Sequence, residues 1–261
     1  ALAKMNLYIH DIRNGQLALG DTLLYPKFKE GDRLKRFDVV IANPPWNQKG
    51  YGESTLKKGE FWRERFKYGF PSSTDSSKKG DWAWIEHMLA SAKDDTGRVG
   101  VVIDNGCLFR GGKEKAIRKS IINEDLIEAV ILLPEKLFYN TGAPGAIIVF
   151  NKNKPEDRKG KILFINASKE FEQHPDVRKL NRLSNENIEK IVNVFMVVVF
   201  KKQPAFQIII DIVRGTTGGL HIHIDFALFQ ILGYQKGRIH TFACAQYQYF
   251  FITNVFYHFM Y

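Results

Sequence analysis

The chain has 261 residues, of which 44% are hydrophobic and 25% charged, a composition ordinary for a globular protein with its own core. Its net charge of +10 favours a polyanionic partner, although an uncommitted basic surface has the same charge. The two cysteines, Cys107 and Cys244, exclude a disulfide framework and favour a cytoplasmic location with free thiols, Cys107 in a packing role. The sequence contains no run of about 18 apolar residues, which a membrane span would need, so we expect no membrane partner.

The first predicted elements are a helix and a short strand. Leu2, Met5 and Ile9 recur at helical spacing and predict the end of an amphipathic helix with these residues on its inner face. Residues 17–19 are a strand candidate.

The chain does not begin with methionine or with a secretory signal, so we expect it to start partway through a longer protein.

The clearest strand covers residues 37–42. It is apolar after Asp38, as expected for a central parallel strand that is covered on both faces. The sequence Asn-Pro-Pro-Trp at 43–46 follows at once, and two prolines cannot continue a sheet ladder. The strand is therefore predicted to end at this tetrapeptide.

A long polar segment separates this strand from the next helix. Residues 47–80 are rich in Lys, Gly and Ser and predict a long loop, functional or mobile, with one short helix around 61–66. Asp81 is the predicted N-cap of a helix. The inner face of that helix is expected to carry Ile85, Met88, Leu89 and Ala92.

Strands and helices then alternate. A helix is predicted over 113–122, with Ile117 and Ile121 facing inward. Further strands are predicted at 98–103, 126–133, 145–150 and 161–166. This alternation predicts an α/β fold with an open, doubly wound and mostly parallel sheet.

The character of the sequence changes near Asn193. After Met196 there is no Glu, aromatic residues and His become frequent, and no clean period persists. We therefore divide the chain into a catalytic domain at 1–194 and an atypical tail at 195–261. The tail is either the product of a reading-frame slip or a small β-rich appendage. Its irregularly spaced histidines do not predict a metal site.

The tetrapeptide Asn43-Pro44-Pro45-Trp46 has a composition suited to methylation of an exocyclic amine. Ligands of open α/β sheets bind at the carboxyl ends of the strands, where this tetrapeptide lies. The Asn43 oxygen and the Pro44 carbonyl can each accept one amine hydrogen, which directs the nitrogen lone pair at a methyl donor. The prolines hold that carbonyl rigidly, and Trp46 offers a surface for a base that has left its duplex. A simple turn at Asn-Pro is the alternative.

Several segments, in a continuous order, resemble the modification subunit of type I restriction-modification systems, a family of DNA adenine-N6 methyltransferases. Besides the tetrapeptide, the resemblance rests on segments over roughly residues 1–194 and fades after them. The segments that carry it include Asp81-Trp82-Ala83-Trp84-Ile85-Glu86-His87, Gly97-Arg98-Val99-Gly100, Gly106-Cys107-Leu108-Phe109-Arg110-Gly111-Gly112, Leu137-Phe138-Tyr139-Asn140-Thr141-Gly142 and Ile147-Ile148-Val149-Phe150.

The resemblance implies roles for further residues. Asp21 would bind the adenine amine of S-adenosylmethionine, with a turn role as the alternative, and Asn43 would also lie beside this cofactor. Asn140 and Thr141 would lie near the target-base pocket, or form only a hairpin turn. A basic cluster beside Gly111-Gly112 would contact DNA phosphates or form a solvated helix face. It comprises Arg110, Lys113, Lys115, Arg118 and Lys119.

The resemblance also implies what the chain lacks. A Gly-rich Asp-Pro-x-x-Gly-x-Gly turn and an acidic residue for the cofactor ribose would precede residue 1, so we expect a Rossmann-like methyltransferase fold without its first β-α unit. Expected partners are double-stranded DNA, a specificity subunit and a restriction subunit. Three alternatives stay open: methylation of protein glutamine or of RNA, an inactive fragment, and a non-catalytic DNA-binding or assembly module.

Overall fold

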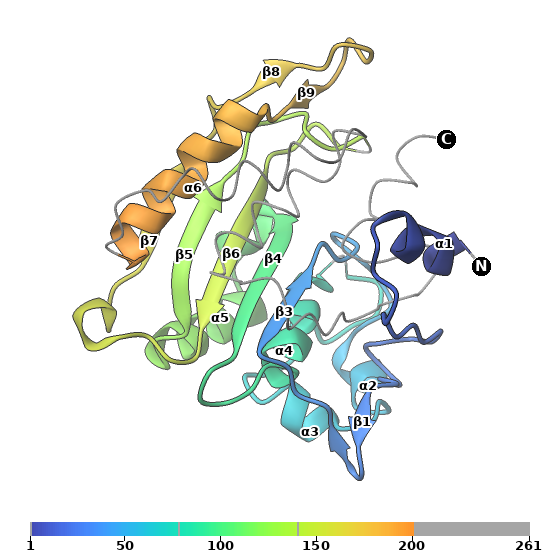
Figure 1. The fold of residues 1–261 in the computed structure, drawn as a ribbon. Coiled ribbons are helices and arrows are strands. Elements are labelled where there is room, and N and C mark those ends of the chain that lie inside the picture. The colour runs from blue at the N-terminus through green and yellow to red at the C-terminus, as the bar shows by residue number, and fades with distance from the viewer. Residues whose placement is uncertain (1, 78, 140, 201–261) are drawn as a thin grey trace.

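The computed structural model describes residues 2–77, 79–139 and 141–200 (Figure 1). Their centre is a five-stranded sheet in the order β3-β4-β6-β5-β7. Only β6 among these strands runs opposite to the others, since β3 and β4 are parallel, β5 and β7 are parallel, and both β4 and β5 pair antiparallel with β6. The strands are β3 (Val39–Ala42), β4 (Arg98–Asp104), β5 (Ile127–Leu132), β6 (Gly145–Asn151) and β7 (Leu163–Asn166). The predicted mostly parallel sheet is confirmed.

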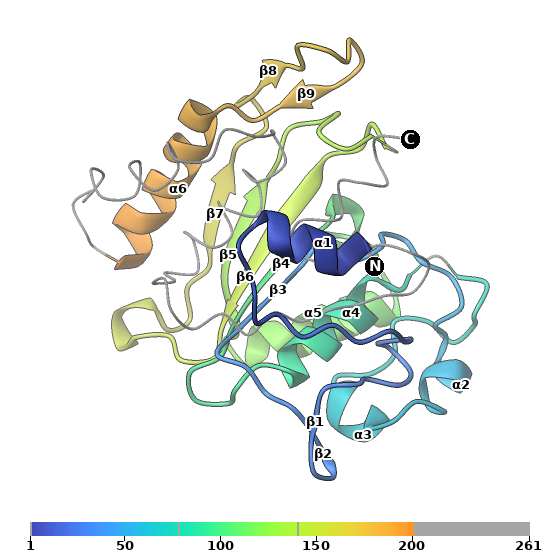
Figure 2. The ribbon, with the colours of Figure 1, turned by 45° about the vertical axis from the view of Figure 1, so that its right-hand side comes forward.

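Helices cover both faces of this sheet (Figures 1 and 2). Alternate strand residues point to opposite faces, so Val102 and Val149 pack with α6 (Asn185–Phe200), whereas Val101 and Ile148 pack on the other face. Two helices cover that other face, α4 (Asp81–Ala90) and α5 (Lys113–Asn123). Two apolar layers with the sheet between them make the doubly wound arrangement that the alternation predicted.

Helix α4 is buried on all sides rather than along one stripe. Every residue from Asp81 to Leu89 is buried, because the helix packs against the sheet on one side and against the 47–80 segment on the other. The predicted N-cap is wrong: Gly80 occupies that position, and Asp81 is the first helical residue, without a capping hydrogen bond. The Asp81 carboxylate is used elsewhere, as described below.

The 47–80 segment is more structured than a loop. The predicted helix around 61–66 is α3 (Trp62–Arg65), and a second short helix, α2 (Glu53–Leu56), was not predicted. Leu56, Phe66 and Trp84 belong to a separate apolar cluster beneath this segment. Before it lies a small antiparallel pair, β1 (Lys29–Glu30) with β2 (Arg33–Leu34).

The N-terminal expectations were partly wrong. Helix α1 (Leu2–Ile9) is present, but Met5 and Ile9 are 58% and 77% exposed, and its buried residues are Ala3 and Leu7. Residues 17–19 form no strand. Three inward positions in one short helix were too few to determine which face packs.

The remaining elements follow the sheet in sequence. A 3-10 turn, η1 (Asn105–Leu108), follows β4 and holds Cys107, which is buried in the core as predicted. After β6 come η2 (Glu156–Arg158) and the antiparallel pair of β8 (Glu172–Gln173) and β9 (Asn181–Arg182). Within the described part of the chain, no helix has the length and apolarity required for a membrane crossing.

Helix α6 was not predicted from sequence. The helix passes through the proposed boundary at residue 194, and Phe195 and Val199 are buried against the sheet. Cys244 and the tail beyond Phe200 lie outside the described residues. The division into 1–194 and 195–261 therefore stays a prediction.

Candidate active site at the carboxyl end of β3

The tetrapeptide begins where β3 ends, at the carboxyl edge of the sheet. Its strand pairs with β4 in parallel, with Ala42 opposite Val101, so the tetrapeptide lies beside the end of β4. Pro44 is buried, Pro45 is exposed, and Asn43 and Trp46 are each partly exposed. The tetrapeptide is therefore accessible at the edge where ligands of open α/β sheets bind.

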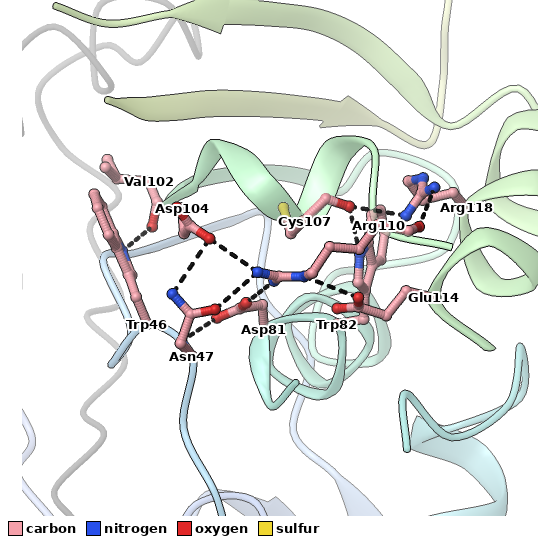
Figure 3. Close-up of polar contacts among 10 residues, drawn as sticks. All are labelled: Trp46, Asn47, Asp81, Trp82, Val102, Asp104, Cys107, Arg110, Glu114 and Arg118. Atoms are coloured by element: carbon pink, nitrogen blue, oxygen red, sulfur yellow. Dashed lines mark hydrogen bonds and ion pairs between the residues drawn. The ribbon is translucent and has the colours of Figure 1, made fainter. Parts of the chain in front are cut away.

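The Trp46 ring is held by three neighbours. Its Nε1 donates to Asn43 Oδ1 at 3.0 Å and to the carbonyl of Val102 at 3.3 Å, the second contact being visible in Figure 3. Phe138 packs edge-to-face on the ring, with centroids 4.6 Å apart. A Cβ on Gly145 would lie 2.9 Å from both the Trp46 and the Phe138 rings, so glycine is needed for their close packing. The indole position is thus set by β4, by the segment after β5 and by the first residue of β6.

The Asn43 carboxamide is oriented but retains capacity. A carboxamide oxygen has two acceptor positions, and the Trp46 indole uses one of them. One acceptor position and the partial exposure of the side chain leave room for an outside donor. This is the arrangement that accepting an amine hydrogen requires.

The segment after β5 contributes to the same edge. Phe138, which contacts Trp46, forms an isolated antiparallel bridge with Thr141, and Thr141 Oγ1 accepts from the backbone nitrogen of Ala143 at 3.1 Å. Thr141 therefore takes part in a turn close to the tetrapeptide. Asn140 lies outside the described residues. Phe138 was quoted in the sequence motif but was not predicted as a site residue, because its contact with Trp46 spans 92 positions of sequence.

Asp21 is engaged in a turn. Its Oδ1 accepts from the backbone nitrogens of Leu23 at 3.0 Å and Leu24 at 3.1 Å, and its Oδ2 accepts from the Tyr51 hydroxyl at 3.2 Å. This is the alternative that the sequence left open for Asp21, an aspartate that binds its own backbone two and three residues on. The Tyr51 hydrogen bond joins Asp21 to the 47–80 segment.

The basic cluster divides into partly buried members, Arg110 and Arg118, and exposed members, Lys113, Lys115 and Lys119. Arg110 is surrounded by carboxylates, and Arg118 donates to the carbonyls of Cys107 and Arg110 at 2.9 and 2.6 Å, so both guanidinium groups bind protein atoms. Lys113 is exposed and pairs with Glu53 Oε2 at 2.8 Å, and Lys57 binds the other oxygen of that carboxylate. Hydrogen bonds from Lys113 and Lys57 lower the pKa of Glu53 to about 2. Lys113 keeps the exposure that phosphate contact needs, whereas Arg110 does not.

A polar network next to the tetrapeptide was missed from sequence. Figure 3 shows Asn47 between Asp104, Asp81 and Arg110, and Glu114 on the far side of Arg110. These residues come from four separate segments, so no spacing rule brings them together. The only local signals are an acidic residue at the end of a buried strand and an asparagine directly after the tetrapeptide.

Besides Asp81, two further buried ionisable groups lie in α4, Glu86 and His87. Burial raises the pKa of Glu86 to about 9, only partly offset by the Tyr68 backbone nitrogen that donates to its Oε2 at 3.1 Å. Burial also lowers the pKa of His87 well below its usual value, so both side chains are neutral near pH 7. Among the described residues, no group of three or more His, Cys, Asp or Glu side chains is arranged to hold a metal ion.

Comparison with known proteins places these features in one family. The profile of the family described as "N-6 DNA Methylase" matches residues 1–217. Two methylase subunits of type I restriction enzymes from Methanocaldococcus jannaschii, MjaVIII and MjaVII, are 50% and 53% identical to the chain over 217 and 196 residues. These matches cover 81% and 74% of this chain but 36% and 33% of the relatives, so the chain spans about a third of their length.

A solved structure agrees with the sequence matches. The methyltransferase subunit of a type I restriction-modification system from Streptococcus thermophilus superposes with a TM-score of 0.61 and 34% identity, covering 74% of this chain and 38% of that one. The resemblance that the tetrapeptide and its flanking segments predicted is therefore confirmed, and the Rossmann-like fold is that of a methyltransferase. The chain belongs to the N-6 DNA methylase family.

Proposed function

We propose that the protein containing this chain transfers a methyl group from S-adenosylmethionine to the N6 amine of adenine in double-stranded DNA. The observation that carries the proposal is the partly exposed Asn43, whose oxygen is oriented at the carboxyl edge of the sheet beside an aromatic ring, in a chain of this family. Relatives named as methylase subunits of type I restriction enzymes support the same substrate class.

The chemistry follows from the positions of the acceptors. An adenine amine is a poor nucleophile because its lone pair is delocalised into the ring. Asn43 Oδ1 and the Pro44 carbonyl would each accept one amine hydrogen, so the nitrogen becomes more tetrahedral and its lone pair points away from the ring plane. Pro44 and Pro45 restrict the backbone and hold the carbonyl in place before the base arrives. Trp46 would contact the base after it leaves the duplex.

The described residues fit the methyl donor only in part. Asp21, the expected ligand of the donor's adenine, has both carboxylate oxygens engaged by Leu23, Leu24 and Tyr51. No Asp-Pro-x-x-Gly-x-Gly turn occurs in the 261 residues. We therefore expect calorimetry of these residues with S-adenosylmethionine to give no micromolar binding, and a micromolar signal would contradict the view that these 261 residues lack a working cofactor site.

The partners are proposed from the same relatives. Their names describe subunits of larger enzymes, so we propose that this protein works with a specificity subunit, which selects the DNA sequence, and with a restriction subunit. The residues of this chain would then contribute phosphate contacts through Lys113 rather than base readout. A cytoplasmic location is proposed with them, on the basis of cysteine usage.

The proposal is tested by methyl transfer with the full gene product and its specificity subunit. Labelled S-adenosylmethionine is offered with duplex DNA, with RNA, or with a glutamine-containing peptide, and we expect label only in the adenine N6 position of DNA. Asn43→Ala should lower turnover roughly 100- to 1000-fold, because one positioned hydrogen-bonding group is lost. Asn43→Asp, which keeps the acceptor oxygen, should retain more activity than Asn43→Ala. Label in RNA or peptide alone, or near-normal turnover of Asn43→Ala, would refute it.

A further inference from the structure

The residue that follows the tetrapeptide has an unusual backbone conformation. Asn47 has a φ of 54°, in the left-handed region that non-glycine residues adopt at a cost of about 1 kcal/mol or more. Three of its polar atoms are each bound by a different partner. Its backbone nitrogen donates to Asp81 Oδ1 at 2.8 Å, its Nδ2 donates to Asp104 Oδ2 at 3.2 Å, and its Oδ1 accepts from Arg110 Nη1 at 2.8 Å. Side-chain contacts therefore hold the chain in this conformation as it leaves Trp46.

Arg110 joins the partners of Asn47 to one another. Its guanidinium binds Asp81 through Nη2, Asp104 through Nη1 at 2.9 Å and Glu114 through Nε at 2.9 Å, in addition to Asn47. The side chains of Asp81 and Glu114 are fully buried, and that of Asp104 is 12% exposed. Buried carboxylates need a paired cation, so removal of this guanidinium would leave mutually repelling groups next to Asn47.

The surrounding backbone fits this ion network closely. A Cβ on Gly106 would lie 2.7 Å from Asp104 Oδ2 and 3.0 Å from Arg110 Nη1, so the network occupies the space that a side chain would take. The next residue, Gln48, is also docked on the start of α4: its carbonyl accepts from the Gly80 nitrogen at 3.1 Å and its Oε1 from Trp84 Nε1 at 3.2 Å. The exit from the tetrapeptide is thus attached to β4 through Asp104, to α4 through Asp81 and Trp84, and to Arg110, which precedes α5.

We propose that Arg110 and Asn47 are positioning residues that hold Trp46 and Asn43 in the geometry for amine binding, an inference that rests on the proposed function. The tetrapeptide is fixed at its start by β3, and the Asn47 contacts fix its end. Because Trp46 Nε1 binds both Asn43 Oδ1 and the Val102 carbonyl, movement of Asn47 would displace the indole and release the Asn43 oxygen together. This role replaces the phosphate contact expected for Arg110, whose guanidinium nitrogens are all bound within the protein.

The test uses Asn47→Gly, Arg110→Lys and a control in the full gene product. Glycine adopts a positive φ without strain, so Asn47→Gly removes the side-chain bonds while leaving the backbone conformation accessible. Lysine keeps the charge of Arg110 but lacks the planar fork that binds several partners. Asp11→Gly is the matched control, since Asp11 has a φ of 55° and contacts only the exposed Arg13 through its side chain.

Two measurements separate this proposal from the proposed function. The first is the exchange rate of the Trp46 indole N–H by nuclear magnetic resonance, which needs no activity. We expect exchange to accelerate about tenfold or more in Asn47→Gly and Arg110→Lys, with unchanged protection of β4 and β6 amides, and no change in Asp11→Gly. The second is DNA methylation, where kcat should fall roughly 10- to 100-fold with little change in KM for DNA.

The outcomes are decisive for each part. Unchanged indole exchange in both site variants overturns the positioning role, whatever the activity. Accelerated exchange with kcat within twofold of the wild type also overturns it, because the geometry would then not matter for turnover. If indole exchange accelerates in the variants but the wild type methylates RNA or peptide rather than DNA, the positioning role is supported and the proposal of DNA as the substrate is refuted.

Discussion

The indole nitrogen of Trp46 donates to the side-chain oxygen of Asn43 at 3.0 Å, so the last residue of the tetrapeptide orients the first. The same nitrogen also binds the Val102 carbonyl, which ties both residues to the neighbouring strand β4. Trp46 consequently has two separable properties, a ring face for stacking and a donor for orientation. Substitutions can remove one property without the other.

Trp46→Phe should be tolerated better than Trp46→Ala in methyl transfer by the full gene product. Phenylalanine keeps an aromatic face and loses only the donor, whereas alanine loses both. Stacking of one base on an aromatic side chain contributes about 1–3 kcal/mol, so kcat/KM for DNA should fall roughly 10- to 100-fold in Trp46→Ala. Equal losses in the two variants would mean that the indole donor, and not the ring, is the essential feature.

Gly145→Ala should disturb the aromatic contact behind the tetrapeptide. The added Cβ would lie 2.9 Å from the rings of Trp46 and Phe138, and overpacking of this kind costs about 1–3 kcal/mol of stability. Gly142→Ala is the matched control, since its Cβ would meet nothing within 4 Å. We expect thermal unfolding to show a lower Tm for Gly145→Ala only. A normal Tm together with normal turnover would show that the rings move apart freely.

Glu86 should make stability depend on pH. Its pKa is raised by burial from 4.5 to about 9, so the folded state holds a proton that the unfolded state has lost across this window. The stability contributed by this group is fully present below pH 4.5 and is lost as the pH rises towards 9. The loss reaches up to about 3 kcal/mol by pH 7.

Glu86→Gln should remove this dependence, because glutamine does not ionise. In urea unfolding at pH 5 and pH 8, the variant should lose less stability than the wild type between the two values. Glu135→Gln, at an exposed position, serves as the control and should follow the wild type. Parallel pH profiles for Glu86→Gln and the wild type would contradict the neutral state of Glu86.

Lys113→Gln should weaken DNA binding in a salt-dependent way. Lys113 is exposed at the start of α5, and a lysine that contacts one phosphate contributes about 1 to the slope of log K against log salt concentration. We expect the slope measured by fluorescence anisotropy to become shallower by about 1. Lys161→Gln, just before β7 and thus towards the opposite end of the sheet, should leave the slope unchanged. An unchanged slope in Lys113→Gln would assign this lysine to its ion pair with Glu53.

The sequence alone determined the features that depend on neighbouring residues. The apolar run before Asn43 and the two prolines after it defined β3 and the place where it ends, because side-chain burial and ring geometry act locally. The same patterns located β4, α5, β5 and β6 to within a residue or two. The sequence also contains the tetrapeptide and the flanking motifs that predicted the family.

Only the tertiary structure decided what depends on distant contacts. Asn47 binds Asp81, Asp104 and Arg110 across 34, 57 and 63 positions, and no local rule selects such partners. Arg110 looked like a phosphate ligand because its sequence neighbours are basic, yet buried carboxylates from other elements surround it. Met5 and Ile9 are exposed for the corresponding reason: a helical period predicts an apolar face, but the elements packed nearby determine which face is covered.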